Sequence, residues 1–168
     1  MENLWAPWRS KYLYLRKRKK CIFCVEKRSR KPKKINRETM SKDADKKRYI
    51  LDRSEYSFSM LNIYPYNNGH IMVAPFRHVS DIYLLTEEEL GDLMKLVKKM
   101  KRALDKKLKP HGYNIGMNIG KAAGAGFDGH LHIHIVPRWE GDTNFMPVVT
   151  DVKVVPESLD AMYDLLIK

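Results

Sequence analysis

The chain has 168 residues, 43% of them hydrophobic and 31% charged, which suits one domain with a packed core. Its 32 Lys and Arg against 20 Asp and Glu give a net charge of +12, which favours anionic partners such as nucleotides, nucleic acid or an anionic membrane. Two cysteines are too few for a secreted disulfide framework, and no signal sequence or membrane-spanning apolar run occurs. We therefore expect one cytoplasmic domain over residues 1–168 without a membrane partner.

The N-terminal part of the chain is strongly basic. Residues 1–20 open on Trp5-Ala6-Pro7-Trp8 and end in a run of five Lys and Arg, which predicts an arm that packs on the body or on a partner. Residues 26–48 hold eleven Lys or Arg and four Asp or Glu. Because this segment has little apolar area to bury, it is predicted to be a mobile loop.

Two neighbouring strands are expected next. Ser57–Leu61 alternates between polar and apolar residues, and a second apolar run covers His70–Ala74. The turn-forming sequence Asn67-Asn68-Gly69 comes directly before the second run. This order predicts two adjacent antiparallel strands.

The clearest helix is predicted from Thr86 to about Leu108. Thr86 with Glu89 three residues later forms a capping box, and Pro110 ends the helical pattern. The apolar residues recur at helical spacing and predict one buried stripe, made of Leu90, Leu93, Met94, Val97, Met100 and Leu104.

Two more strands and a C-terminal helix are predicted after the long helix. Tyr113–Asn118 and His130–Val136 read as strands, joined by a loop of small residues over 120–126, and residues 157–167 form a short amphipathic helix. Strands dominate the middle of the chain, with one long helix inserted. The predicted fold class is therefore α+β, with an antiparallel sheet of about five strands, one long helix and a C-terminal helix.

Three of the six histidines alternate in the last predicted strand. His130, His132 and His134 would share one face, because side chains in a strand alternate between faces. A solvent-facing strand needs no such run of histidines. A single metal cannot easily bind all three, because neighbouring ligands on one strand face lie about 7 Å apart.

Nucleophilic attack on phosphorus is the third interpretation of this run. A neutral imidazole can form a phosphoramidate that a second acceptor then cleaves. Such a nucleophile needs one ring nitrogen held as a donor, so that the other keeps a free lone pair. It also needs hydrogen-bond donors around the phosphate, which the small-residue loop upstream could supply through its amides.

At this point the sequence resembles the histidine triad family. His130-Leu131-His132-Ile133-His134-Ile135-Val136 fits its motif, in which apolar residues alternate with three histidines. Within the family, the chain is most similar to the bacterial diadenosine tetraphosphate phosphorylases. That similarity rests on several separated motifs: Trp5-Ala6-Pro7-Trp8-Arg9, Asn62–Asn67, Ala123–Gly126, Pro137-Arg138-Trp139 and Gly141–Pro147.

The resemblance implies a role for each site residue. His132 would be the nucleophile at the α-phosphorus, His134 would bind phosphate oxygens, and His70 would set the imidazole tautomer or contact phosphate. The nucleotide-binding residues would be Asn62 at the ribose and, around the phosphates, Asn118, Gly124, Ala125 and Gly126.

One departure from the family pattern leaves the general acid open. Many members carry Gln and then Ser or Thr shortly before the first triad histidine, where this chain reads Ala125-Gly126-Phe127-Asp128-Gly129. Backbone amides could replace those side chains, or Asp128 could act on a proton.

The two cysteines stand three positions apart, as in half of a zinc site. The spacing alone is a modest signal, because two buried cysteines are often just small hydrophobes. The resemblance implies that His78 and the first triad histidine, His130, complete a structural Cys₂His₂ zinc site with Cys21 and Cys24. It also implies that the reaction itself needs no metal.

The function implied is nucleotidyl transfer, most simply phosphorolysis of diadenosine tetraphosphate to ADP and ATP, with inorganic phosphate as acceptor and a homodimer as the assembly. Hydrolysis of dinucleoside polyphosphates or of nucleoside phosphoramidates would use the same intermediate. The excess of positive charge also admits a nucleic-acid-binding protein, although no such motif is present. A regulatory nucleotide binder would need no nucleophile.

Overall fold

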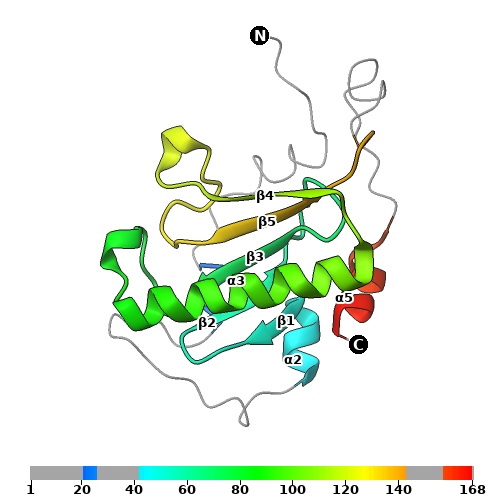
Figure 1. Ribbon diagram of the computed structural model, residues 1–168. Coiled ribbons are helices and arrows are strands. Elements are labelled where there is room, and N and C mark those ends of the chain that lie inside the picture. The colour runs from blue at the N-terminus through cyan, green and yellow to red at the C-terminus, as the bar shows by residue number, and fades with distance from the viewer. Residues whose placement is uncertain (1–20, 26–41, 143–156, 168) are drawn as a thin grey trace.

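The computed structural model describes residues 21–25, 42–142 and 157–167 (Figure 1). The tryptophan arm and residues 26–41 of the predicted loop lie outside these ranges. Residues 42–48 were also expected to belong to that loop. This prediction is wrong for residues 42–47, because helix α2 spans Lys42–Lys47. Acidic side chains in its first turn and lysines in its last stabilise the helix against its dipole.

In the part of the chain that the structure describes, five strands form one antiparallel sheet, which confirms the predicted fold class. The order across the sheet is β1-β2-β3-β5-β4, so the last strand in the sequence lies inside the sheet. The strands are β1 (Ile50–Arg53), β2 (Ser57–Leu61), β3 (Ile71–Pro75), β4 (Gly112–Met117) and β5 (Ile133–Arg138).

The pairing of β2 with β3 is confirmed, with a register that runs from Ser57 opposite Pro75 to Leu61 opposite Ile71. The strand predicted from His130 begins three residues later, at Ile133. The reason is that the amide of Leu131 donates to the carbonyl of Val79, outside the sheet, at 2.6 Å. The residues before Ile133 are therefore held by the segment that follows β3.

Helix α3 spans Glu87–Leu108 and crosses one face of the sheet (Figure 1). Thr86 and Glu89 form the predicted capping box. Met94 was expected on the buried stripe, but its side chain is 43% exposed, because it lies about 100° around the helix from Leu93. Leu96 is buried instead. Helix α5 (Leu159–Ile167) packs on the same core. Within the described ranges, short 3₁₀ helices cover Ile82–Leu84 and Lys121–Ala123.

A second apolar cluster covers the opposite face of the sheet. Residues of β2 and β3 that point away from α3, such as Phe58 and Met72, pack there against Phe23 and Phe76. Phe23 belongs to the short segment 21–25, which is thereby fixed beneath the sheet. The cysteines on either side of Phe23 are carried to this face with it.

Two glycines give a matched test of the packing. Gly69 has φ +68° and lies under α3, where an added Cβ would be 2.5 Å from Leu108 Cδ1 and 3.0 Å from Leu104 Cδ2. We expect Gly69→Ala to lower the free energy of unfolding by about 2 kcal/mol through backbone strain and overpacking. Gly91 faces open space within α3, so Gly91→Ala should raise it by about 1 kcal/mol. Urea unfolding measures both, and a stabilising Gly69→Ala would contradict this packing.

None of the helices in the described ranges has the length and apolar character that crossing a bilayer requires.

Candidate active site and metal centre

His70, His132 and His134 gather on and beside β3 and β5, on the face of the sheet opposite α3. The rings of His132 and His134 lie 4.8 Å apart between centroids, and those of His70 and His134 lie 5.1 Å apart. Ile133 and Ile135 point the other way, into the core beneath α3. The alternation predicted for the histidine run is therefore present, but His130 turns toward the cysteines and leaves the cluster around His134.

The hydrogen bonds assign the tautomer of His132. Its Nδ1 lies 2.8 Å from the carbonyl oxygen of His130, and because a carbonyl can only accept, Nδ1 carries the hydrogen. Nε2 then bears a free lone pair. Burial lowers the pKa of His132 below its ordinary value, although the bond to the carbonyl opposes this effect. The ring is therefore a neutral imidazole with one nucleophilic nitrogen.

A chain of donors assigns the opposite tautomer to His134. The amide of Tyr66 donates to Nδ1 of His70 at 3.1 Å, and the side-chain amide of Asn62 lies 3.3 Å from the same atom. His70 must then carry its hydrogen on Nε2, which donates to Nδ1 of His134 at 2.9 Å. His134 is left with its hydrogen on Nε2. A ring with a lone pair and a ring with an N–H donor thus stand side by side.

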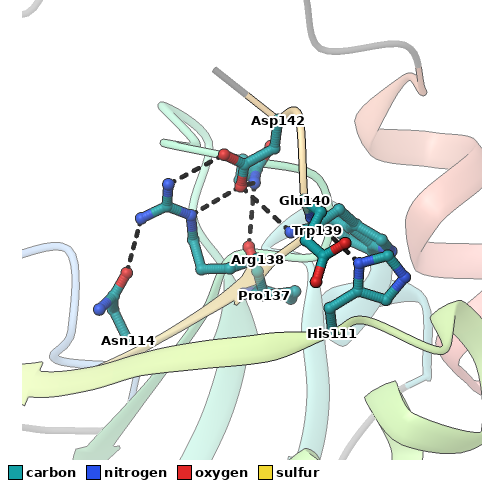
Figure 2. Close-up of polar contacts among 8 residues, drawn as sticks. His111, Asn114, Pro137, Arg138, Trp139, Glu140 and Asp142 are labelled. Atoms are coloured by element: carbon teal, nitrogen blue, oxygen red, sulfur yellow. Dashed lines mark hydrogen bonds and ion pairs between the residues drawn. The ribbon is translucent and has the colours of Figure 1, made fainter.

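The loop that carries His70 is fixed to the end of β5. Arg138 donates twice to the carboxylate of Asp142, at 2.6 and 2.9 Å, and once to Asn114 on β4 at 2.8 Å (Figure 2). Asp142 also accepts from Asn67 at 2.8 Å, and the carbonyl of Asn67 accepts from the amide of His70. These contacts position His70. From the sequence, Asn67 was predicted only to be a turn residue and was not connected with Asp142, because 75 residues separate them.

The residues expected to bind nucleotide lie on two connections. Asn62 follows β2, where its carbonyl side-chain oxygen accepts from the amide of Tyr64 at 2.9 Å. Asn118 is half-buried just after β4. In the loop beyond it, the amide of Gly124 donates to Lys121 at 3.0 Å and that of Ala125 to Gly120 at 3.4 Å. A phosphate bound by Gly124–Gly126 would accept hydrogen bonds from these two amides in place of the two carbonyls.

Asp128, one of the two alternatives for a general acid, lies on the surface of the same connection. Its side chain is 46% exposed, and one carboxylate oxygen lies 3.9 Å from the amino group of Lys121. Its neighbour Phe127 packs edge-on against Phe23. The end of the small-residue loop is therefore anchored on segment 21–25.

The four expected metal ligands converge on one point. The ligand atoms of Cys21, Cys24, His78 and His130 all lie within 4.8 Å of one another. Cys21 Sγ is 3.4 Å and Cys24 Sγ 4.0 Å from Nδ1 of His130, and Cys24 Sγ is 3.3 Å from Nδ1 of His78. Such separations fit the edges of a tetrahedron with metal–ligand distances of about 2.0–2.3 Å.

The chemistry of these side chains also fits zinc. Nε2 of His130 donates to the carbonyl of Pro75 at 2.9 Å, which leaves the lone pair on Nδ1, facing the sulfur atoms. Burial raises the pKa of the Cys21 thiol to about 11, so a bound cation is needed to stabilise the thiolate. Two sulfur and two imidazole donors form a set that zinc prefers.

Comparison with other proteins extends these observations. The HIT domain pattern matches residues 44–141. A protein of Mycobacterium tuberculosis named AP-4-A phosphorylase is 41% identical over 116 residues, which are 69% of this chain and 60% of that protein. The chain thus spans less than two thirds of that relative.

Two solved structures are similar over more of their length. A hypothetical histidine triad nucleotide-binding protein of Sulfolobus tokodaii is 31% identical, with a TM-score of 0.60 and coverage of 88% of this chain and 87% of that one. A zinc-bound histidine triad family protein of Mycobacterium smegmatis is 27% identical, with a TM-score of 0.58 and coverage of 71% and 81%.

Proposed function

Because the chain belongs to the histidine triad (HIT) family, we propose that it is a nucleotidyltransferase acting on dinucleoside polyphosphates, with His132 as the nucleophile. The observation that carries the proposal is the hydrogen bond from Nδ1 of His132 to the carbonyl of His130. It leaves Nε2 unprotonated in a buried ring, which is the form that attacks phosphorus.

The reaction has two steps. Nε2 of His132 attacks the α-phosphorus of diadenosine tetraphosphate, a P–N bond forms, and the bond from that phosphorus to the bridging oxygen breaks to release ATP. An oxygen of inorganic phosphate then attacks the same phosphorus, the P–N bond breaks, and ADP leaves. His134 donates its Nε2 hydrogen to the phosphate oxygens, with the tautomer set by His70.

The nucleotide is proposed to lie along the connections on either side of these rings. Asn62 hydrogen-bonds the ribose, and Asn118 with the loop Gly124–Gly126 lines the phosphates. The net charge of +12 supports binding of polyphosphates and of a phosphate acceptor. Phosphorolysis is favoured over hydrolysis or phosphoramidate cleavage by the similarity to the mycobacterial AP-4-A phosphorylase.

Zinc is proposed to be a structural ion, held by Cys21, Cys24, His78 and His130. Four protein ligands close a tetrahedral site, so no position remains for substrate. The ion would cross-link segment 21–25 to the residues just before β5 and to the segment after β3. The nucleotidyl transfer itself is proposed to use no metal.

Incubation with diadenosine tetraphosphate, with and without inorganic phosphate, tests the proposal. We expect ADP and ATP in equal amounts, formed only when phosphate is present, with products separated by anion-exchange chromatography. AMP and ATP without phosphate would identify a hydrolase instead. AMP released only from a nucleoside phosphoramidate would identify a phosphoramidase. Salt-dependent binding of nucleic acid without any turnover would refute nucleotidyl transfer.

A homodimer is the proposed assembly. β4 is an edge strand of the sheet, and its residue Ile115 is 46% exposed. Pairing of this edge with a second copy would engage the backbone groups of β4 that β5 does not pair, and would cover this side chain. Light scattering is expected to give a mass of twice 19.7 kDa, and Ile115→Lys is expected to shift it toward the monomer.

A further inference from the structure

Phe23 lies between the two cysteine ligands and touches the proposed nucleophile. Its side chain is 1% exposed. The ring stacks on His132, with centroids 4.5 Å apart and planes inclined by 26°, and lies 5.3 Å from the ring of His130. It therefore covers one face of the His132 imidazole.

The orientation of Phe23 is set by the turn that carries the cysteines. The amide of Cys24 donates to the carbonyl of Cys21 at 3.3 Å, and that of Val25 donates to Phe23 at 2.9 Å. Phe127 meets the ring edge-on, with centroids 6.0 Å apart and planes at 80°. Any ion that binds both sulfur atoms fixes this turn, and with it the position of the ring.

His130 provides a second connection between the same two sites. Its Nδ1 faces the sulfur atoms of Cys21 and Cys24. Its carbonyl accepts the Nδ1 hydrogen of His132. One residue thus contacts the metal centre with its side chain and holds the nucleophile with its backbone.

We propose that the metal centre positions the nucleophile, with Phe23 as a positioning residue whose ring holds the His132 imidazole in its attacking orientation. The kinetic part of this inference rests on the proposed function. The carbonyl of His130 holds Nδ1 of the His132 imidazole, but this single hydrogen bond alone still allows the plane of the ring to tilt. Stacking on Phe23 restricts that tilt, so the lone pair on Nε2 keeps one direction.

Phe23→Leu tests the role of the aromatic ring, and Phe58→Leu is its matched control. Phe58 is a buried aromatic of the same cluster, but its ring stacks on Phe76. With zinc bound, Phe23→Leu is expected to lower kcat for diadenosine tetraphosphate about 10- to 100-fold with KM nearly unchanged, because a small displacement of a reacting group is costly. Phe58→Leu should change kcat by less than about twofold, and Phe23→Tyr should recover most of the loss. Equal kcat in Phe23→Leu and the unchanged protein would overturn the inference.

A second measurement does not depend on turnover. The Nδ1 hydrogen of His132 should give a sharp imidazole N–H signal in the NMR spectrum of the zinc-loaded protein, assigned through its loss in His132→Asn. The signal is expected to broaden in zinc-loaded Phe23→Leu and after zinc is removed by chelation, and to stay sharp in Phe58→Leu. A sharp signal in both the variant and the metal-free protein would overturn the inference. If the unchanged protein turns over no nucleotide, the proposed function fails, and this spectrum still decides the positioning role.

Discussion

His132→Asn is expected to lower kcat for diadenosine tetraphosphate by about 10⁴-fold or more, as loss of a nucleophile does in enzymes with covalent intermediates. Asn cannot form the P–N bond, and the neighbouring His134 cannot replace it, because Nε2 of that ring carries a hydrogen. Steady-state kinetics with phosphate present gives the loss of rate.

Two further measurements make this prediction specific. Rapid quenching of the unchanged protein with labelled substrate should leave the nucleotide on His132, as located by peptide mass spectrometry, and the variant should carry none. His111→Asn is the control, since His111 lies in the turn before β4, where it accepts a hydrogen bond from the amide of Glu140 (Figure 2). Near-full activity of a folded His132→Asn protein would contradict the proposed mechanism.

Loss of the metal centre is expected to have the largest effect on stability. Cys24→Ser should abolish zinc binding and lower the free energy of unfolding by more than about 4 kcal/mol, which is typical when a structural metal is lost. Cys24 Sγ approaches both His78 and His130, so its removal separates segment 21–25 from both. Elemental analysis and denaturant unfolding measure the two effects.

The same experiment has internal controls. The unchanged protein should carry about one zinc per chain, as a closed Cys₂His₂ site requires, and His111→Ala should keep it. Chelation should reproduce the loss of stability, and added zinc should restore it by mass action. A purified protein that folds fully without any zinc would show that these four residues have no structural ion to hold.

The parts of this fold that sequence predicted well are those set by local chemistry. The capping box at Thr86 and the end of α3 depend on residues within one or two helical turns. β1 was missed because it is four residues long and follows a highly charged segment, so its apolar residues show no clear period. Its place in the sheet comes from pairing with β2.

In the candidate site, too, local sequence patterns predicted some features, and contacts between distant residues determine the others. The histidine motif and the cysteine spacing brought the candidate residues to attention, and the structure gathers all four expected metal ligands. The tautomers could not be predicted, because they depend on the amide of Tyr66 and the carbonyl of His130. The contact of Phe23 with His132 joins residues more than a hundred positions apart. The spacing of residues within a motif cannot predict such a contact.

The place of β5 in the sheet has a consequence for how the protein folds. Among the described residues, β5 is the last strand in the sequence, but it pairs with both β3 and β4 inside the sheet, and its contacts with β3 join Val73 to Ile133 and Ile71 to Ile135. Closing such long loops is slow compared with forming neighbouring hairpins. During synthesis, β1, β2, β3 and α3 emerge before the strand that carries His134. The ribosome-bound chain can therefore bury part of its core before the histidines at β5 are in place, and under the proposed function enzymatic activity would report that β5 has joined the sheet.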